Sequence, residues 1–177
     1  MIRVFLLIGA RANTPKPCSG DRLRMIFGSV DDLYRIILGL DLMPITYERD
    51  DARRCIVVTT IGDVSLEEML AVVDRQASEG TWRYGTLYDS RYVTSVANQT
   101  EVRIGLMHVD TLSRLHGRRG PVAFVTTMPA AYGMVRMYST LAGQQQQAVE
   151  AFRDIGDAER WLAAHTDGEA AADTPAQ

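Results

Sequence analysis

The chain has 177 residues, of which 46% are hydrophobic and 23% charged, and 19 Lys and Arg against 22 Asp and Glu give a formal net charge of -3. This length and composition suit one globular domain with extensions. The absence of a long basic run argues against nucleic-acid binding, and no apolar stretch is long enough for an integral membrane segment. Cys18 and Cys55 lack CxxC spacing, so neither a disulfide framework nor a thiolate metal site is expected, and a cytoplasmic location is predicted.

Residues 1–42 form a separate N-terminal segment in this interpretation. An apolar run over 4–10 is followed by a connector over 13–20 that is rich in proline and glycine. A helix is then expected to begin after Ser29 and to end before Pro44, because a serine cap, acidic residues and apolar residues at helical spacing follow one another.

The second part of the chain alternates short β-type runs with amphipathic helices. Strands over 45–49 and 54–61 flank a charged turn, a pattern that is typical of an antiparallel hairpin. Ser65 and Glu68 have the spacing of a capping box, in which the two residues satisfy free amides at a helix start. Gly80 ends that helix.

The next helix, 99–116, carries more apolar surface than one sheet face can cover. A strand over 86–89 precedes it and opens into Ser90-Arg91-Tyr92. One row of the helix contains Val102, Leu106, Val109 and Ser113, and the other side contains Ile104, Met107, His108, Thr111 and Leu115. The surplus apolar surface indicates a partner, a ligand or a subunit interface.

The last elements complete an α/β pattern. The continuous apolar run 122–125 suits a central strand, and Pro129 suits the first turn of a third helix. A strand over 148–152 follows, Asp157 is expected to cap a short helix, and residues 166–177 are expected to form a disordered tail. The order β-β-α-β-α-β-α-β-α predicts an α/β fold with a mixed, mostly parallel sheet and crossover helices.

Short segments in a fixed order then suggest a family. They are Met43-Pro44-Ile45-Thr46-Tyr47-Glu48, Tyr88-Asp89-Ser90, Val122-Ala123-Phe124-Val125, Tyr132-Gly133-Met134-Val135-Arg136-Met137-Tyr138 and Phe152-Arg153-Asp154. Their order, more than any single motif, resembles the bacterial STAS/SEC14-domain proteins, which have the fold of the anti-sigma-factor antagonists. The resemblance covers residues 43–165 and implies a STAS-like (SpoIIAA-like) architecture for that domain.

The resemblance also bears on the N-terminal segment. Family members commonly start near Met43, which implies that residues 1–42 are an extension produced by an over-extended gene start. The capped helix expected after Ser29 favours the alternative, a translated segment.

The resemblance implies a regulatory function. In the anti-sigma-factor antagonists an Asp-Ser-Ser helix start carries a serine whose phosphorylation controls partner binding. The matching stretch here has no Asp-Ser-Ser, so Ser95 and Thr94 are the substitutes for a phosphorylation site. The expected function is a non-enzymatic STAS-like module that binds a protein partner. The first alternative is SEC14-like binding of a small apolar ligand or lipid, and the second is an uncharacterised enzyme.

The sequence shows no catalytic, metal or cofactor constellation. The three histidines lack metal-type spacing. The chain contains no GxSxG elbow, no GxGxxG loop and no P-loop. No catalytic residue, metal or cofactor is therefore predicted.

A set of side chains is predicted to bind a ligand or partner. The set is Asp89, Ser90, Arg91, Ile104, His108, Tyr132 and Arg136. The first three lie at a strand end, where open α/β sheets place binding groups, although aspartate and serine are also common turn residues. The next two lie on the surplus face of the second helix. The last two are one helical turn apart and suit either an anion or partner clamp or a solvated face with a local cation–π contact. The expected occupants are a protein partner, a second copy of the chain or a small apolar ligand.

Overall fold

The computed structural model describes residues 44–172, with side chains up to residue 166, and the predicted α/β class is confirmed there. The expected extension 1–42 and residues 173–177 lie outside the described residues. The elements in chain order are β1 (Ile45–Asp50), β2 (Cys55–Gly62), α3 (Leu66–Ser78), β3 (Gly85–Val93), α4 (Gln99–His116), β4 (Val122–Val125), α5 (Pro129–Gln144), β5 (Val149–Phe152) and α6 (Ile155–Ala172).

The strands of the described range form one mixed sheet in the order β1-β2-β3-β4-β5. β1 and β2 form the predicted antiparallel hairpin, with Ile45 opposite Thr60 and Asp50 opposite Cys55. β2 to β5 run parallel, because α3, α4 and α5 return the chain to the same end of the sheet between strands. The predicted mixed, mostly parallel sheet with crossover helices is thus confirmed.

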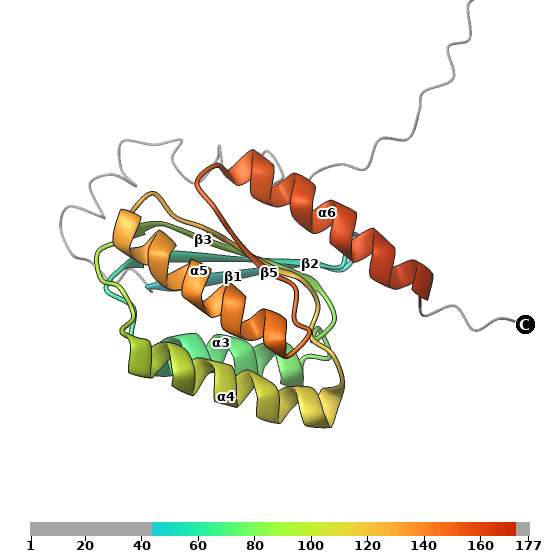
Figure 1. Ribbon diagram of the computed structural model, residues 1–177. Coiled ribbons are helices and arrows are strands. Elements are labelled where there is room, and N and C mark those ends of the chain that lie inside the picture. Colours follow the sequence, from blue (N-terminus) through green and yellow to red (C-terminus); the bar gives the residue numbers. More distant parts are fainter. Residues whose placement is uncertain (1–43, 173–177) are drawn as a thin grey trace, which may run out of the picture.

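The sheet separates α3, α4 and α5 on one face from α6 on the other (Figure 1). Side chains that follow one another along a strand point to opposite faces, so β2 to β5 contribute to both layers. The first core contains Ile56, Val58, Tyr88, Val122 and Val149 from the strands and Val72, Val102, Leu106 and Ala142 from the helices. The second contains Leu87, Ala123 and Val125 from the strands and Ala158 and Leu162 from α6.

The predicted end of the third strand is corrected by the structure. β3 continues past Asp89 to Val93, because Ile61 pairs with Tyr92 and the sheet resumes beyond a register shift in β2. Ser90, Arg91 and Tyr92 therefore belong to the strand.

At the start of α6, Asp154 Oδ1 accepts the backbone N–H of Asp157 at 3.1 Å, so Asp154 and not Asp157 caps the helix. α6 also runs to Ala172, past residue 166, where the tail was expected to begin.

Capping boxes start α3 and α4, whereas α5, which follows β4 at the same end of the sheet, has no side-chain cap. The predicted box of α3 is present: Ser65 Oγ accepts from Glu68 N at 3.2 Å, and Glu68 Oε2 accepts from Ser65 N at 2.8 Å. The latter bond holds the pKa of the Glu68 carboxyl below its usual value. At α4, Asn98 and Glu101 form a second box that the sequence reasoning missed. These caps fix where the two helices begin over the sheet.

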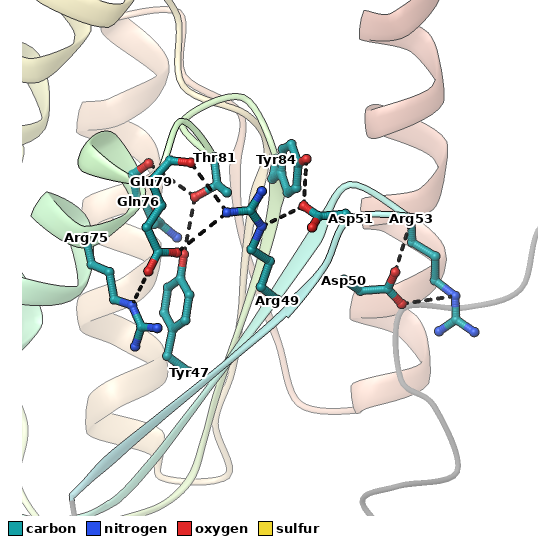
Figure 2. Close-up of polar contacts among 10 residues, drawn as sticks. All are labelled: Tyr47, Arg49, Asp50, Asp51, Arg53, Arg75, Gln76, Glu79, Thr81 and Tyr84. Carbon is teal, nitrogen blue, oxygen red and sulfur yellow. Dashed lines mark hydrogen bonds and ion pairs between the residues drawn. The ribbon is translucent and has the colours of Figure 1, made fainter.

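A polar network, defined here as the β1–α3 network, joins the edge strand β1 to the end of α3 (Figure 2). Arg49 Nε donates to Asp51 Oδ1 at 2.6 Å, and Tyr84 Oη donates to the same oxygen at 2.9 Å. Arg75 Nε donates to Glu79 Oε1 at 2.7 Å, and Arg49 Nη1 lies 4.0 Å from Glu79 Oε2. These bonds hold the pKa of Asp51, mainly through Arg49, and of Glu79, mainly through Arg75, below the usual values.

Candidate functional site

A cavity of about 210 Å³ lies between the sheet and the helices α3, α4 and α5. Its walls are mainly apolar and include Val73 of α3, Val102 and Val109 of α4, Phe124 of β4 and Met134 of α5. The same helices that cover this face of the sheet therefore leave a space at their common junction.

One side of the cavity lies at the carboxyl ends of the parallel strands. Thr60, Ser90 and Thr126 come from β2, β3 and the residue after β4, and all line the cavity. Thr60 Oγ1 lies 2.9 Å from Ser90 Oγ in a hydrogen bond. Open α/β sheets tend to bind ligands beyond the carboxyl ends of their strands, so this is a favourable position for a site.

The guanidinium of Arg119, which is 4% exposed, lines the same cavity. Nη2 donates to Gln76 Oε1 and, at 3.3 Å, to Tyr88 Oη. The Trp82 ring lies against the group, with its centroid 5.3 Å from Cζ. Nε has no hydrogen-bond partner in the part of the chain that the structure describes. Because arginine remains protonated in proteins, this is a buried positive charge.

The side chains around Arg119 are neutral. Gln76 is an amide, and Tyr138 lines the cavity as a phenol. Burial raises the pKa of the Tyr138 hydroxyl, and the charge of Arg119 opposes this only in part, so Tyr138 stays protonated at neutral pH. Within residues 44–166 no carboxylate forms an ion pair with Arg119. A buried charge without a counter-ion costs free energy, which marks the cavity as a candidate binding site.

Gly105 leaves room in the α4 wall. It lies between Val102 and Val109 at helical spacing, and all three line the cavity. A Cβ added to Gly105 would meet no atom within 4 Å. A larger side chain at this position would therefore extend into open space beside the sheet.

Of the residues predicted to bind a ligand or partner, Ser90 lines the cavity. Asp89 is fully buried and, by the alternation of the strand, faces the side that α6 covers. Arg91 Nε and Nη2 donate to the carboxylate of Asp89 at 2.8 and 2.7 Å. This hydrogen bonding raises the pKa of Arg91. The Asp89–Arg91 pair stabilises the last part of β3.

The predicted residues on α4 lie outside the cavity. His108 Nε2 lies 2.6 Å from Asp74 Oδ1 and joins α4 to α3. Ile104 is exposed on the outer side of the helix. The two candidate phosphorylation sites, Ser95 and Thr94, are both exposed, and Ser95 lines the cavity. The backbone N–H of Thr94 donates to Gly62 O at 2.8 Å.

Tyr132 and Arg136 on α5 each contact a different partner. The guanidinium of Arg153 lies 4.4 Å from the centroid of the Tyr132 ring. Arg136 Nη1 donates to Glu150 Oε1 at 3.2 Å. Tyr132 and Arg136 therefore do not form the predicted clamp with each other.

Sequence reasoning missed Arg119, the buried cation of the site. It lies in the run Gly117-Arg118-Arg119-Gly120, where nothing in the residue types separates an exposed arginine from a buried one. The structure gives the reason for the difference: a Cβ on Gly120 would collide with the backbone of Arg83 and Tyr84, and Gly120 N donates to Trp82 O at 3.0 Å. This close approach places Arg119 against Trp82.

No group of three or more His, Cys, Asp or Glu residues in the described range is arranged to hold a metal ion. None of the described helices combines the length and the apolar character that crossing a bilayer requires.

Comparison with known proteins finds similarity among solved structures. No family model and no curated protein matches the sequence. Among solved structures, an uncharacterized protein from the DUF3478 family with a SpoIIAA-like fold, from Shewanella loihica PV-4, is similar with a TM-score of 0.45 and 17% sequence identity. The similarity covers 67% of this chain and 91% of that chain. The fold class of this protein follows from its own sheet order and helix placement.

Proposed function

We propose that the protein is a binding module that holds a small apolar molecule in the cavity between the sheet and α3, α4 and α5. The observation that carries the proposal is the cavity itself, with about 210 Å³ of space and mainly apolar walls. An apolar cavity of about 150 Å³ admits benzene, whereas pockets that hold drug-sized ligands have volumes of about 300–1,000 Å³. The expected ligand is therefore a single ring or a short acyl chain.

The packing around the cavity supports a binding role. Phe124, Met134 and Tyr138 pack against the core, yet each remains partly accessible. Protein interiors are normally close-packed, and space left beside core residues lowers stability because dispersion contacts are lost. A ligand in the cavity would restore these contacts, so a binding function gives the space a physical reason.

A substitution that fills the cavity tests the proposal. The Gly105→Leu variant should lose binding of toluene and 1-hexanol, measured by saturation-transfer NMR on the ligand, because leucine occupies the open space. Gly133→Leu is the matched control, since Gly133 is exposed on α5 and its added Cβ would also meet no atom within 4 Å. Both changes remove a helical glycine and raise helix propensity. Binding that is equal in all three proteins would contradict the proposal.

A STAS-like regulatory module that contacts a protein partner is the second candidate function, favoured by a stripe on the outer side of α4. The stripe, defined as Ile104, Met107 and Leu115, is 42%, 70% and 73% exposed. It is centred near Thr111, so an antiparallel copy of the helix related by a two-fold axis would place Met107 opposite Leu115. A second copy of the chain is the partner that this symmetry fits.

The second candidate is tested by the association state. Sedimentation velocity should show a dimer for the wild-type chain and a monomer for the double variant Met107→Glu/Leu115→Glu, because charge in an apolar contact is unfavourable. Arg160→Glu, an exposed position on α6 across the sheet, should remain dimeric. A wild-type chain that stays monomeric at every concentration would contradict this function and leave the cavity proposal unaffected.

Ser95 connects the cavity with the regulation predicted from the sequence. It is exposed and lines the cavity beside the start of α4. A phosphate there would add negative charge next to the ligand space, which supports Ser95 over Thr94 as the candidate phosphorylation site.

A further inference from the structure

We propose that the cavity recognises its ligand through a carboxylate that pairs with Arg119, so that the ligand class is a small monocarboxylic acid with one ring or a short acyl chain. The inference rests on the proposed function, and it adds the charge of the ligand and the residue that binds this charge.

Arg119 has donor capacity that the protein does not use. A guanidinium carries five N–H donors, and the bonds from Nη2 to Gln76 and Tyr88 leave Nε–H without an acceptor in the described range. A carboxylate suits this group, because its oxygen can accept a charge-assisted hydrogen bond from Nε–H. A bound carboxylate would supply both the missing acceptor and the missing counter-charge.

The guanidinium is also held in place before a ligand arrives. Gln76 is 1% exposed, and its Nε2 donates to Thr86 Oγ1 at 3.0 Å, so the amide oxygen that receives Arg119 has a fixed position. The Trp82 ring covers the guanidinium at 5.3 Å. Because these contacts fix the side chain, a ligand does not have to order it, and such pre-organisation favours binding.

The charges around the cavity select a monoanion. Among the described wall residues, Arg119 is positive and Glu101 is negative. Glu101 Oε2 accepts from Asn98 N at 2.7 Å in the capping box of α4 and would repel an anion near that helix start. A phosphate monoester carries about -1.5 to -2 charges at neutral pH, more than one guanidinium neutralises. A carboxylate at Arg119, with its apolar part along Val102 and Val109, fits the charge of the site.

The test compares hexanoate with hexanamide and benzoate with benzamide, since each amide has nearly the shape of its acid without the charge. Dissociation constants are measured by NMR titration of the isotope-labelled full chain. Hexanoate and benzoate should bind at least about tenfold more tightly than their amides, because a hydrogen bond to a charged group is worth that much. The comparison in the wild-type chain needs no variant.

Variants then assign the effect to Arg119. Arg119→Met should weaken hexanoate binding by at least about tenfold and leave hexanamide binding within about threefold. Gly105→Leu should abolish binding of both, and Gly133→Leu should change neither.

The outcomes distinguish failure of the carboxylate inference from failure of the cavity proposal. Equal affinity for acid and amide in the wild-type chain, or an acid preference that survives Arg119→Met, would overturn the carboxylate inference while the cavity proposal stands. Absence of binding for every probe, or binding that Gly105→Leu does not affect, would overturn both.

Discussion

The protein places arginines in two opposite environments. In the β1–α3 network, Arg49 and Arg75 lie 2.6 and 2.7 Å from carboxylate oxygens and remain open to water. In the cavity, Arg119 is buried and its hydrogen-bond partners in the described range are an amide and a phenol. Exposed ion pairs contribute little to stability, whereas a buried charge without a counter-ion is costly. The folded chain alone thus explains the network, whereas the ligand proposed above would explain the buried charge in the cavity.

The comparison separates charges that the fold itself pairs from the charge that we propose binds a ligand. The pair of the buried Asp89 and the partly exposed Arg91 belongs with the network, because the anion and cation satisfy each other through two hydrogen bonds. Arg119 differs from all three of these arginines in the nature of its partners. We therefore expect changes at Arg119 to affect ligand binding most, and changes in the network to affect only the stability of the fold.

The largest effect is expected for Gln76→Leu. The substitution removes the oxygen that accepts from the buried Arg119 and leaves the cation with fewer partners. The free energy of unfolding should fall by about 2–3 kcal/mol, since a buried charged donor loses its acceptor. Urea denaturation followed by circular dichroism measures this change.

A double-mutant cycle shows whether the loss comes from the charge. Arg119→Met in the Gln76→Leu background should restore about 1 kcal/mol or more, because no unpaired cation is then buried. A double variant less stable than Gln76→Leu alone would mean that Arg119 stabilises the fold through other contacts, and the contrast with the network would fail.

Much of the fold could be predicted from the sequence, because its signals are local. The alternating strand pattern, the Ser65 capping box and Pro129 at a helix start depend on residues close in the chain, and the structure contains each of them. The end of β3 could not be predicted, because it depends on pairing with β2 across a register shift.

The site was largely beyond sequence reasoning. Ser90 was singled out because strand ends are local features, but the burial of Arg119 depends on contacts with Trp82 and Gln76 that lie far away in the chain. Gly105 gave no signal either, since a glycine inside a helix does not reveal that open space lies beside it. Charge and space at the cavity are properties of the tertiary structure.

A smaller effect is expected for Arg75→Met in the β1–α3 network. The substitution breaks the ion pair with Glu79, and the Arg75 guanidinium also leaves the ring of Tyr47, which lies 4.1 Å from it. Because Arg75 is exposed and Glu79 is partly exposed, the loss of stability should be far smaller than for Gln76→Leu. In about 1 M salt, urea denaturation should show an even smaller difference from the wild type, since the Debye length there is about 3 Å. A loss that is large and independent of salt would show that this network is not a surface feature.

The smallest effect is expected in the acid response of Asp51→Asn. Hydrogen bonds from Arg49 and then from Tyr84 hold the pKa of Asp51 below its usual 3.8 in the folded chain. A lowered folded-state pKa means that the carboxylate stabilises the fold above the unfolded value of 3.8 and that this stabilisation disappears as the pH falls through the folded value. The wild type should therefore lose more stability on acidification through this range than Asp51→Asn, when urea denaturation is repeated over a pH series. Asp63→Asn, which lies outside the network, should follow the wild type, and a parallel fall of all three proteins would show that the Asp51 contacts do not stabilise the chain.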